Sequence, residues 1–299
     1  MTPREMIRIG NGQLSAAINP YGAELSHLED ANGRELMTDA DPAFWTGRAP
    51  ILFPVIGVTN GSVIRLDGRE YPMAKHGFAR HSLFEVAAQG DGEARFALED
   101  SEETRASYPF PFRLEIGFRL DALTLHLEAA ITNRGERAMP AQFGFHPALA
   151  WPLPFGEDRA AHRITFDKPE PGRLREIAPD GLIAAETRES PLDGDQGHGG
   201  NELLLRDALF EHDALVWDPV ASQSVDYGAA QGPVLRVAFP DTPRLGVWTK
   251  PGAHFVCIEP WHGLADPEGF TGDFHDKPGV FEVAAGDTKR IGMSITLVV

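Results

Sequence analysis

The chain has 299 residues, a mass of 32.6 kDa and a formal net charge of −17. Such an acidic surface repels phosphate backbones and anionic lipid headgroups, so we expect no nucleic acid and no membrane as a partner. With 42% hydrophobic and 24% charged residues, the composition is that of a globular protein and excludes global disorder.

Short runs with a period of two recur along the chain, whereas a helical period is hard to find. Residues 4–19 predict an opening hairpin that turns at Gly-Asn-Gly, and a second hairpin is predicted around Asp67-Gly68. Residues 123–131 and 291–299 alternate apolar with smaller or polar side chains, which indicates strands with one buried face. No shift in composition marks a boundary. We therefore predict one all-β domain over residues 1–299, a sandwich of large antiparallel sheets.

One stretch departs from this pattern. Residues 187–201 are polar and rich in turn residues, with no apolar period, so we expect a long loop there. Neither a secretory signal at the N-terminus nor an apolar run long enough to span a bilayer is found, and we expect a cytoplasmic protein.

Cys257 is the single cysteine, which excludes a disulfide framework and a cysteine-rich zinc site. Its apolar neighbours indicate a packed thiol. The sequence shows no nucleotide-binding glycine loop, no metal-binding spacing and no serine nucleophile motif. A metal site assembled through space from the eleven histidines stays open.

Two segments in the first third of the chain carry polar groups in apolar settings. Arg48 interrupts the run WTGRAPILFP at residues 45–54, where a guanidinium needs acceptors from a carboxylate or a ligand. A structural ion pair and simple surface exposure are the alternatives. His76 precedes a glycine in KHGFAR, residues 75–80, and a lone histidine is more often structural than catalytic.

Two later segments place a titratable group on a predicted strand. In residues 142–147, QFGFHP, alternation puts His146 on one face, and the two phenylalanines point into a core. In residues 254–263, HFVCIEPWHG, Glu259 shares a face with Cys257, and a buried carboxylate there needs a partner. Trp261 offers a flat surface for a sugar ring or for core packing. Asp213, in HDALVW, is a weaker candidate, because an acid ahead of a strand is usually a turn residue.

Taken together, these segments resemble the aldose 1-epimerase (galactose mutarotase-like) family, and most closely its LacX-like branch. The matches lie in order from WTGRAPILFPVIG through HGFAR, FGFHPAL and HDALVW to VCIEPWHG, and they cover nearly the whole chain. One departure is the Pro-Ala-Leu that follows His146, where classical galactose mutarotases have an aromatic residue, Asn and Leu. Galactose preference is therefore left open.

The resemblance implies a β-supersandwich, no cofactor and a small sugar as substrate, interconverted between its α and β anomers. Whether the chain acts as a monomer or a homodimer is left open by the sequence. It implies that His146 is the general acid and Glu259 the general base. Arg48, His76 and Asp213 would hold sugar hydroxyls, with His76 close to the ring oxygen. The HGFAR motif also occurs in hexose-6-phosphate mutarotases, which would place Arg80 and Lys75 near a phosphate.

Opening a hemiacetal needs one proton delivered to the ring oxygen and one removed from the C1 hydroxyl, which a histidine and a carboxylate can perform near neutral pH. We expect a bell-shaped pH profile that reports His146 protonated and Glu259 deprotonated. Three alternatives stay open: a sugar-phosphate mutarotase, a non-catalytic sugar-binding protein on the same fold, and a glycoside hydrolase. The hydrolase would need a second carboxylate.

Overall fold

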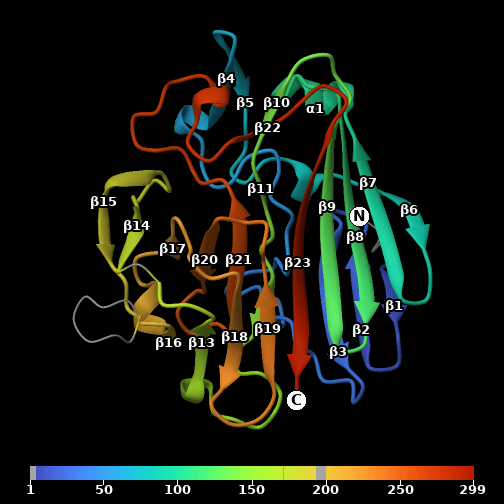
Figure 1. The fold of residues 1–299 in the computed structure, drawn as a ribbon, viewed down its shortest axis with the longest axis vertical. Coiled ribbons are helices and arrows are strands. Elements are labelled where there is room, and N and C mark those ends of the chain that lie inside the picture. Colours follow the sequence, from blue (N-terminus) through green and yellow to red (C-terminus); the bar gives the residue numbers. More distant parts are fainter. Residues whose placement is uncertain (1–4, 171, 193–199) are drawn as a thin grey trace.

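A nine-stranded antiparallel sheet is the largest element of the computed structural model, which describes residues 5–170, 172–192 and 200–299. Its strand order is β16-β13-β18-β19-β23-β9-β8-β7-β6, so the C-terminal strand β23 lies at its centre (Figure 1). The bounds are β6 Glu85–Gln89, β7 Glu93–Glu99, β8 Phe112–Asp121, β9 Thr124–Asn133, β13 His162–Phe166, β16 Glu202–Leu204, β18 Ser224–Ala229, β19 Val234–Ala238 and β23 Thr288–Val298.

A second, seven-stranded antiparallel sheet carries the residues of interest. Its order is β11-β21-β20-β17-β14-β15, and β12 also pairs with β21. The bounds are β11 Phe143–Gly144, β12 Ala148–Ala150, β14 Arg173–Ile177, β15 Ile183–Glu189, β17 Leu215–Trp217, β20 Arg244–Trp248 and β21 Phe255–His262.

Smaller elements complete the fold. Three strands form the sheet β1-β2-β3. Two two-stranded antiparallel sheets, the hairpin β4-β5 and the long-range pair β10-β22, lie at the top of the view in Figure 1. Their bounds are β1 Ile7–Gly10, β2 Leu14–Asn19, β3 Glu24–Asp30, β4 Val63–Leu66, β5 Arg69–Pro72, β10 Met139–Ala141 and β22 Phe281–Val283. The helices are short: α1 Glu102–Ser107 and the 3₁₀ turns η1 Asn60–Ser62, η2 Ala79–His81, η3 Arg159–Ala161, η5 Asp207–Phe210 and η6 Phe274–Asp276.

Alternation explains why these segments form strands. Along β8, buried apolar side chains alternate with half-exposed or exposed residues, as a half-buried strand requires. The two large sheets face each other, with the rings of Phe166 on β13 and Trp217 on β17 4.9 Å apart. The main hydrophobic core draws side chains from Ile9 to Leu297, so the first and last strands share it.

Several predictions from the sequence are confirmed. The chain folds into large antiparallel sheets, β1 and β2 form the opening hairpin, and β4 and β5 form the hairpin around Asp67-Gly68. The loop predicted at residues 187–201 begins later than expected, because β15 continues to Glu189; residues 193–199 lie outside the described residues. Within the described ranges, no helix combines the length and apolar character that crossing a bilayer requires.

Candidate active site

His146 and Glu259 meet on one face of the seven-stranded sheet. Both β11 and β12 pair with β21, and His146 lies in the short break between them. The flanking register pairs are Gly144 with Trp261 and Ala148 with Cys257. Continuing that register across the break sets His146 opposite Glu259, and the His146 Nε2 atom lies 3.1 Å from Glu259 Oε2. Cross-strand pairing therefore brings the predicted acid and base together.

Burial determines the charge of this pair. His146 is 7% exposed and Glu259 is 2% exposed. Burial lowers the pKa of His146 to about 3, and the cations of Arg80 and Lys75 contribute to that shift. Burial, together with the negative charge of Asp213, raises the pKa of Glu259 well above its ordinary value. Both directions favour neutral groups. At rest the pair is therefore a neutral His146 and a protonated Glu259. The sequence had led us to expect a protonated histidine and an ionised carboxylate, which hold the same number of protons.

His76 lies beside the pair, its ring 6.0 Å from that of His146. The backbone N–H of Gly57 donates to His76 Nδ1 at 3.0 Å, so the remaining nitrogen, Nε2, carries the proton of the neutral ring. Burial, followed by the charges of neighbouring groups, lowers the pKa of His76 well below its ordinary value. His76 is consequently a neutral hydrogen-bond donor. Its φ of +65° and the adjoining Gly77 form a tight turn, in which a Cβ on Gly77 would lie 2.1 Å from Phe53 O.

The indole of Trp261 lies over two glycines on neighbouring strands. A Cβ added to Gly144 on β11 or to Gly246 on β20 would come within 2.7 Å of the Trp261 ring. The two strands therefore leave room for this ring to lie across the sheet beside Glu259. Such a flat apolar surface next to an acid and a base suits the apolar face of a sugar ring.

These groups line a cavity of about 270 Å³. The side chains that the sequence singled out and that line it are Lys75, His76, Arg80, His146, Asp213, Glu259 and Trp261. Trp45 and Trp248 also line it, with rings 5.1 Å and 6.0 Å from the His146 ring. Neither tryptophan was predicted from the sequence as a site residue. Trp248 reaches the cavity because β20 pairs with β21 and places Trp248 opposite Cys257. This register joins segments that no local sequence pattern connects.

The cavity is electrostatically divided. Lys75 and Arg80 supply cations, whereas Asp213 and Glu259 supply acidic groups. Arg80 donates from Nε to His81, and burial lowers the pKa of its guanidinium. Among the described residues, no carboxylate oxygen lies within ion-pair distance, 4.0 Å, of a side-chain nitrogen of Lys75 or Arg80. Asp213 has a φ of +68°, and its Oδ1 accepts the N–H of Ala214, which fixes the carboxylate at the cavity edge.

Arg48 does not join this group. Its Nη1 atom donates to the backbone carbonyls of Ser26 at 3.0 Å and Thr38 at 2.7 Å, and it is not among the side chains that line the cavity. The acceptors that an arginine in an apolar run requires are therefore backbone carbonyls, rather than the carboxylate or ligand expected from the sequence. The structure brings together the other seven predicted residues and leaves Arg48 outside the cavity lining.

Comparisons with known proteins agree with this arrangement. A model of the aldose 1-epimerase family matches residues 5–268. Protein LacX, in its plasmid form, from Lactococcus lactis subsp. lactis is 30% identical over 300 residues, which cover 97% of this chain and 99% of LacX.

Two solved structures share the fold over almost the whole chain. One is the galactose mutarotase related enzyme from Lactobacillus acidophilus, with a TM-score of 0.90, 28% identity and coverage of 98% of this chain and 97% of that chain. The other is a galactose mutarotase-like protein from Lactobacillus casei, with a TM-score of 0.89, 28% identity and coverage of 98% and 100%. The fold is thus galactose mutarotase-like.

Proposed function

The chain belongs to the aldose 1-epimerase family, and from this premise we propose that it interconverts the α and β anomers of hexoses by general acid–base ring opening. The observation that carries the proposal is the contact between His146 and Glu259 at the floor of the cavity, 3.1 Å apart. The two oxygens that exchange protons in mutarotation are bonded to the same carbon. An acid and a base that serve them must therefore lie close together, as these two groups do.

The proton count of the pair fits a complete catalytic cycle. The neutral pair holds one mobile proton. At rest the mobile proton lies on Glu259, and it first passes across the 3.1 Å contact to His146 Nε2. In ring opening, the protonated His146 gives this proton to the ring oxygen while the Glu259 carboxylate takes the proton of the C1 hydroxyl. After rotation about the C1–C2 bond, each step runs in reverse on the other face of the carbonyl, and the pair regains its starting state. Family resemblance assigns the ring oxygen to His146 and the C1 hydroxyl to Glu259, and each positioned transfer is typically worth ~10²–10⁴-fold.

The surrounding side chains bind rather than react. We propose that the N–H of His76 and the carboxylate of Asp213 hold sugar hydroxyls, and that Trp261 supports the ring face. Because the substrate must turn about C1–C2 inside the site, binding at remote hydroxyls leaves the reacting carbon free.

An anomer-exchange assay tests this proposal. Freshly dissolved α-D-glucose and α-D-galactose are followed by polarimetry or NMR with the wild type, His146→Gln and Glu259→Gln. His275→Gln is a matched control, because His275 pairs with Glu282 at the surface, away from the cavity. We expect acceleration that only the first two substitutions abolish. Binding of a sugar without acceleration would instead support a non-catalytic sugar-binding protein.

A second candidate function is mutarotation of a sugar phosphate. The observation that favours it is the pair of cations, Lys75 and Arg80, which line the cavity with no carboxylate partner among the described residues. The same assay with glucose 6-phosphate distinguishes the two candidates. A rate enhancement confined to the phosphorylated sugar would replace the first proposal by the second.

A further inference from the structure

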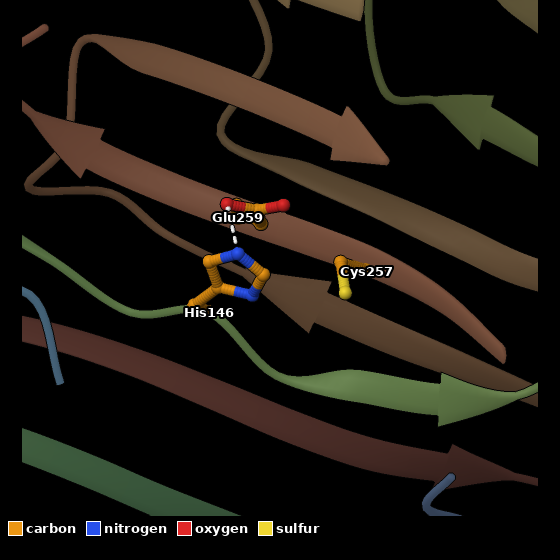
Figure 2. A group of neighbouring side chains, drawn as sticks. All are labelled: His146, Cys257 and Glu259. Carbon is orange, nitrogen blue, oxygen red and sulfur yellow. Dashed lines mark ion pairs between the residues drawn. The ribbon is translucent and has the colours of Figure 1, made fainter. Parts of the chain in front are cut away.

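Cys257 lies beside the catalytic pair and takes no part in the proposed reaction. We propose that His146, Cys257 and Glu259 together bind a borderline-soft divalent cation of the Zn²⁺ class, and that this ion inhibits the enzyme. Each residue offers one ligand atom, and the three atoms lie within 4.8 Å of one another (Figure 2). Imidazole, thiolate and carboxylate are the three ligand types that Zn²⁺ takes in proteins.

The backbone holds these ligands in place. Cys257 and Glu259 are two residues apart on β21 and so project from the same face of the sheet. His146 faces them from the break between β11 and β12. Zinc–ligand bonds of about 2.0–2.3 Å in a tetrahedron put ligand atoms about 3.3–3.7 Å apart. The separation of 3.1 Å between His146 Nε2 and Glu259 Oε2 is already close to that value. The ligand atom of Cys257 lies within 4.8 Å of the other two, so binding an ion would draw it up to about 1 Å closer.

Charge favours the ion in this buried place. Cys257 is fully buried and Glu259 is 2% exposed. A thiolate, a carboxylate and a neutral imidazole around a divalent ion sum to zero charge, whereas either anion alone would be costly to bury.

The fourth coordination position would face the cavity. His146 and Glu259 line the cavity, whereas Cys257 lies behind them against a small apolar cluster that includes Ala148 and Phe255. Three protein ligands with one open position leave room for a water molecule or a sugar hydroxyl. An ion held there occupies the acid and the base at once, so metal binding and mutarotation exclude each other. Only this inhibitory consequence rests on the proposed function; the binding itself does not.

Cobalt(II) titration of the untagged full chain tests the binding directly. Because Cys257 is the single cysteine in the sequence, a thiolate-to-cobalt charge-transfer band in the near ultraviolet reports this site alone. We expect the band in the wild type, its displacement by Zn²⁺, and its loss in Cys257→Ser and Cys257→Ala. In calorimetry, we expect one Zn²⁺ per chain at this site. Mutation of residues that only hydrogen-bond to metal ligands typically lowers metal affinity by ~10–100-fold, and removing the ligand Cys257 should lower Zn²⁺ affinity in both variants by at least as much.

Controls separate this site from surface binding and from misfolding. His275→Gln removes a surface His–Glu pair and should leave the cobalt band unchanged. Circular dichroism in EDTA shows whether each cysteine variant keeps the wild-type fold, and either folded variant suffices for the test. Absence of the band in the wild type, or equal Zn²⁺ affinity in wild type and folded variants, would overturn the proposal. If the anomer-exchange assay is negative, the cobalt band still decides the metal site, so the two proposals fail separately.

Discussion

His146, in the break between β11 and β12, lies opposite Glu259 on β21, with Nε2 and Oε2 3.1 Å apart in a place from which water is almost excluded. This relationship makes them a coupled unit rather than two independent titrating groups. Their desolvation favours a neutral pair that shares one mobile proton. The charge state, the pH dependence and the response to mutation should therefore belong to the pair.

The pH profile of kcat/KM should be bell-shaped and wide. Below the His146 pKa of about 3, the pair gains a second proton and no base remains. Above the raised pKa of Glu259, the pair loses its mobile proton and no acid remains. We expect the acid limb well below the pKa of ~6.5 of an ordinary imidazole and the alkaline limb well above that of an ordinary carboxylate. Anomer exchange measured from pH 3 to 10 in EDTA checks this, and an acid limb near pH 6.5 would contradict it.

A double-mutant cycle should show that the pair acts as a unit. His146→Gln and Glu259→Gln each remove one positioned proton transfer, and each should lower kcat by ~10²–10⁴-fold. Because one group without the other cannot complete the cycle, the double variant should be little worse than the more damaged single variant. Single-turnover anomer exchange by NMR measures this. Multiplicative losses would show that the two groups act independently.

Much of the fold followed from local patterns. Strict alternation predicted β9 and β23, and glycine-containing turns predicted the hairpins β1-β2 and β4-β5. These signals are local, because each residue's burial is set by the face of its own strand. The main core takes side chains from both ends of the chain, and we propose on that ground that residues 1–299 form a single domain.

The site was less accessible to sequence reasoning, for reasons that are mostly long-range. His146 and Glu259 were found because each is a polar group on an apolar strand. Trp248 was missed because it reaches the cavity only through the register of β20 on β21. Arg48 lies outside the cavity lining, and a sequence does not reveal that three backbone carbonyls accept the hydrogen bonds of its guanidinium. The charge state of the pair could not be predicted, because it depends on how deeply the two groups are buried, and that burial is set by all the strands and loops packed around them.

Adding a methyl group under Trp261 should disturb substrate binding. Gly246→Ala places its Cβ 2.7 Å from the indole, so the ring must move. We expect a rise in KM for the hexose with a smaller change in kcat, and a loss of stability of about 1–3 kcal/mol from overpacking. Gly117→Ala is a matched control within a strand, because its Cβ would lie 3.9 Å from the nearest atom, Glu128 O. Equal KM values in the two variants would show that Trp261 does not support the sugar ring.

The two cavity cations give a prediction about substrate charge. If a phosphate lies against them, Lys75→Met or Arg80→Met should lower kcat/KM for glucose 6-phosphate. Loss of a charge-assisted hydrogen bond of about 1.5–3 kcal/mol corresponds to about 10–100-fold. The effect on glucose should be smaller. Arg95→Met, which removes an exposed arginine outside the cavity, is the matched control. Equal losses for glucose and its phosphate in the two cavity variants would exclude a phosphate contact.

A buried ion pair braces one wall of the cavity. Lys277 Nζ lies 2.8 Å from Asp266 Oδ1 and donates to Gln142 Oε1 at 3.1 Å. The same amide oxygen accepts the N–H of Ile56, which lines the cavity. Lys277→Met leaves the Asp266 carboxylate buried without its partner, and we expect a loss of about 3–5 kcal/mol in the free energy of unfolding.

Adding Asp266→Asn to Lys277→Met should recover most of that loss, because the asparagine removes the uncompensated charge and keeps an oxygen for the N–H of Asn60. Urea unfolding compares the single variant, the double variant and Arg290→Met. Arg290 pairs with Glu128 at the surface, where removal of a salt bridge costs less than about 1 kcal/mol. If Lys277→Met lowered the free energy of unfolding no more than Arg290→Met does, the buried ion pair would not stabilise this wall of the cavity. A destabilisation that the second substitution reverses would trace the effect to the unpaired charge rather than to lost packing.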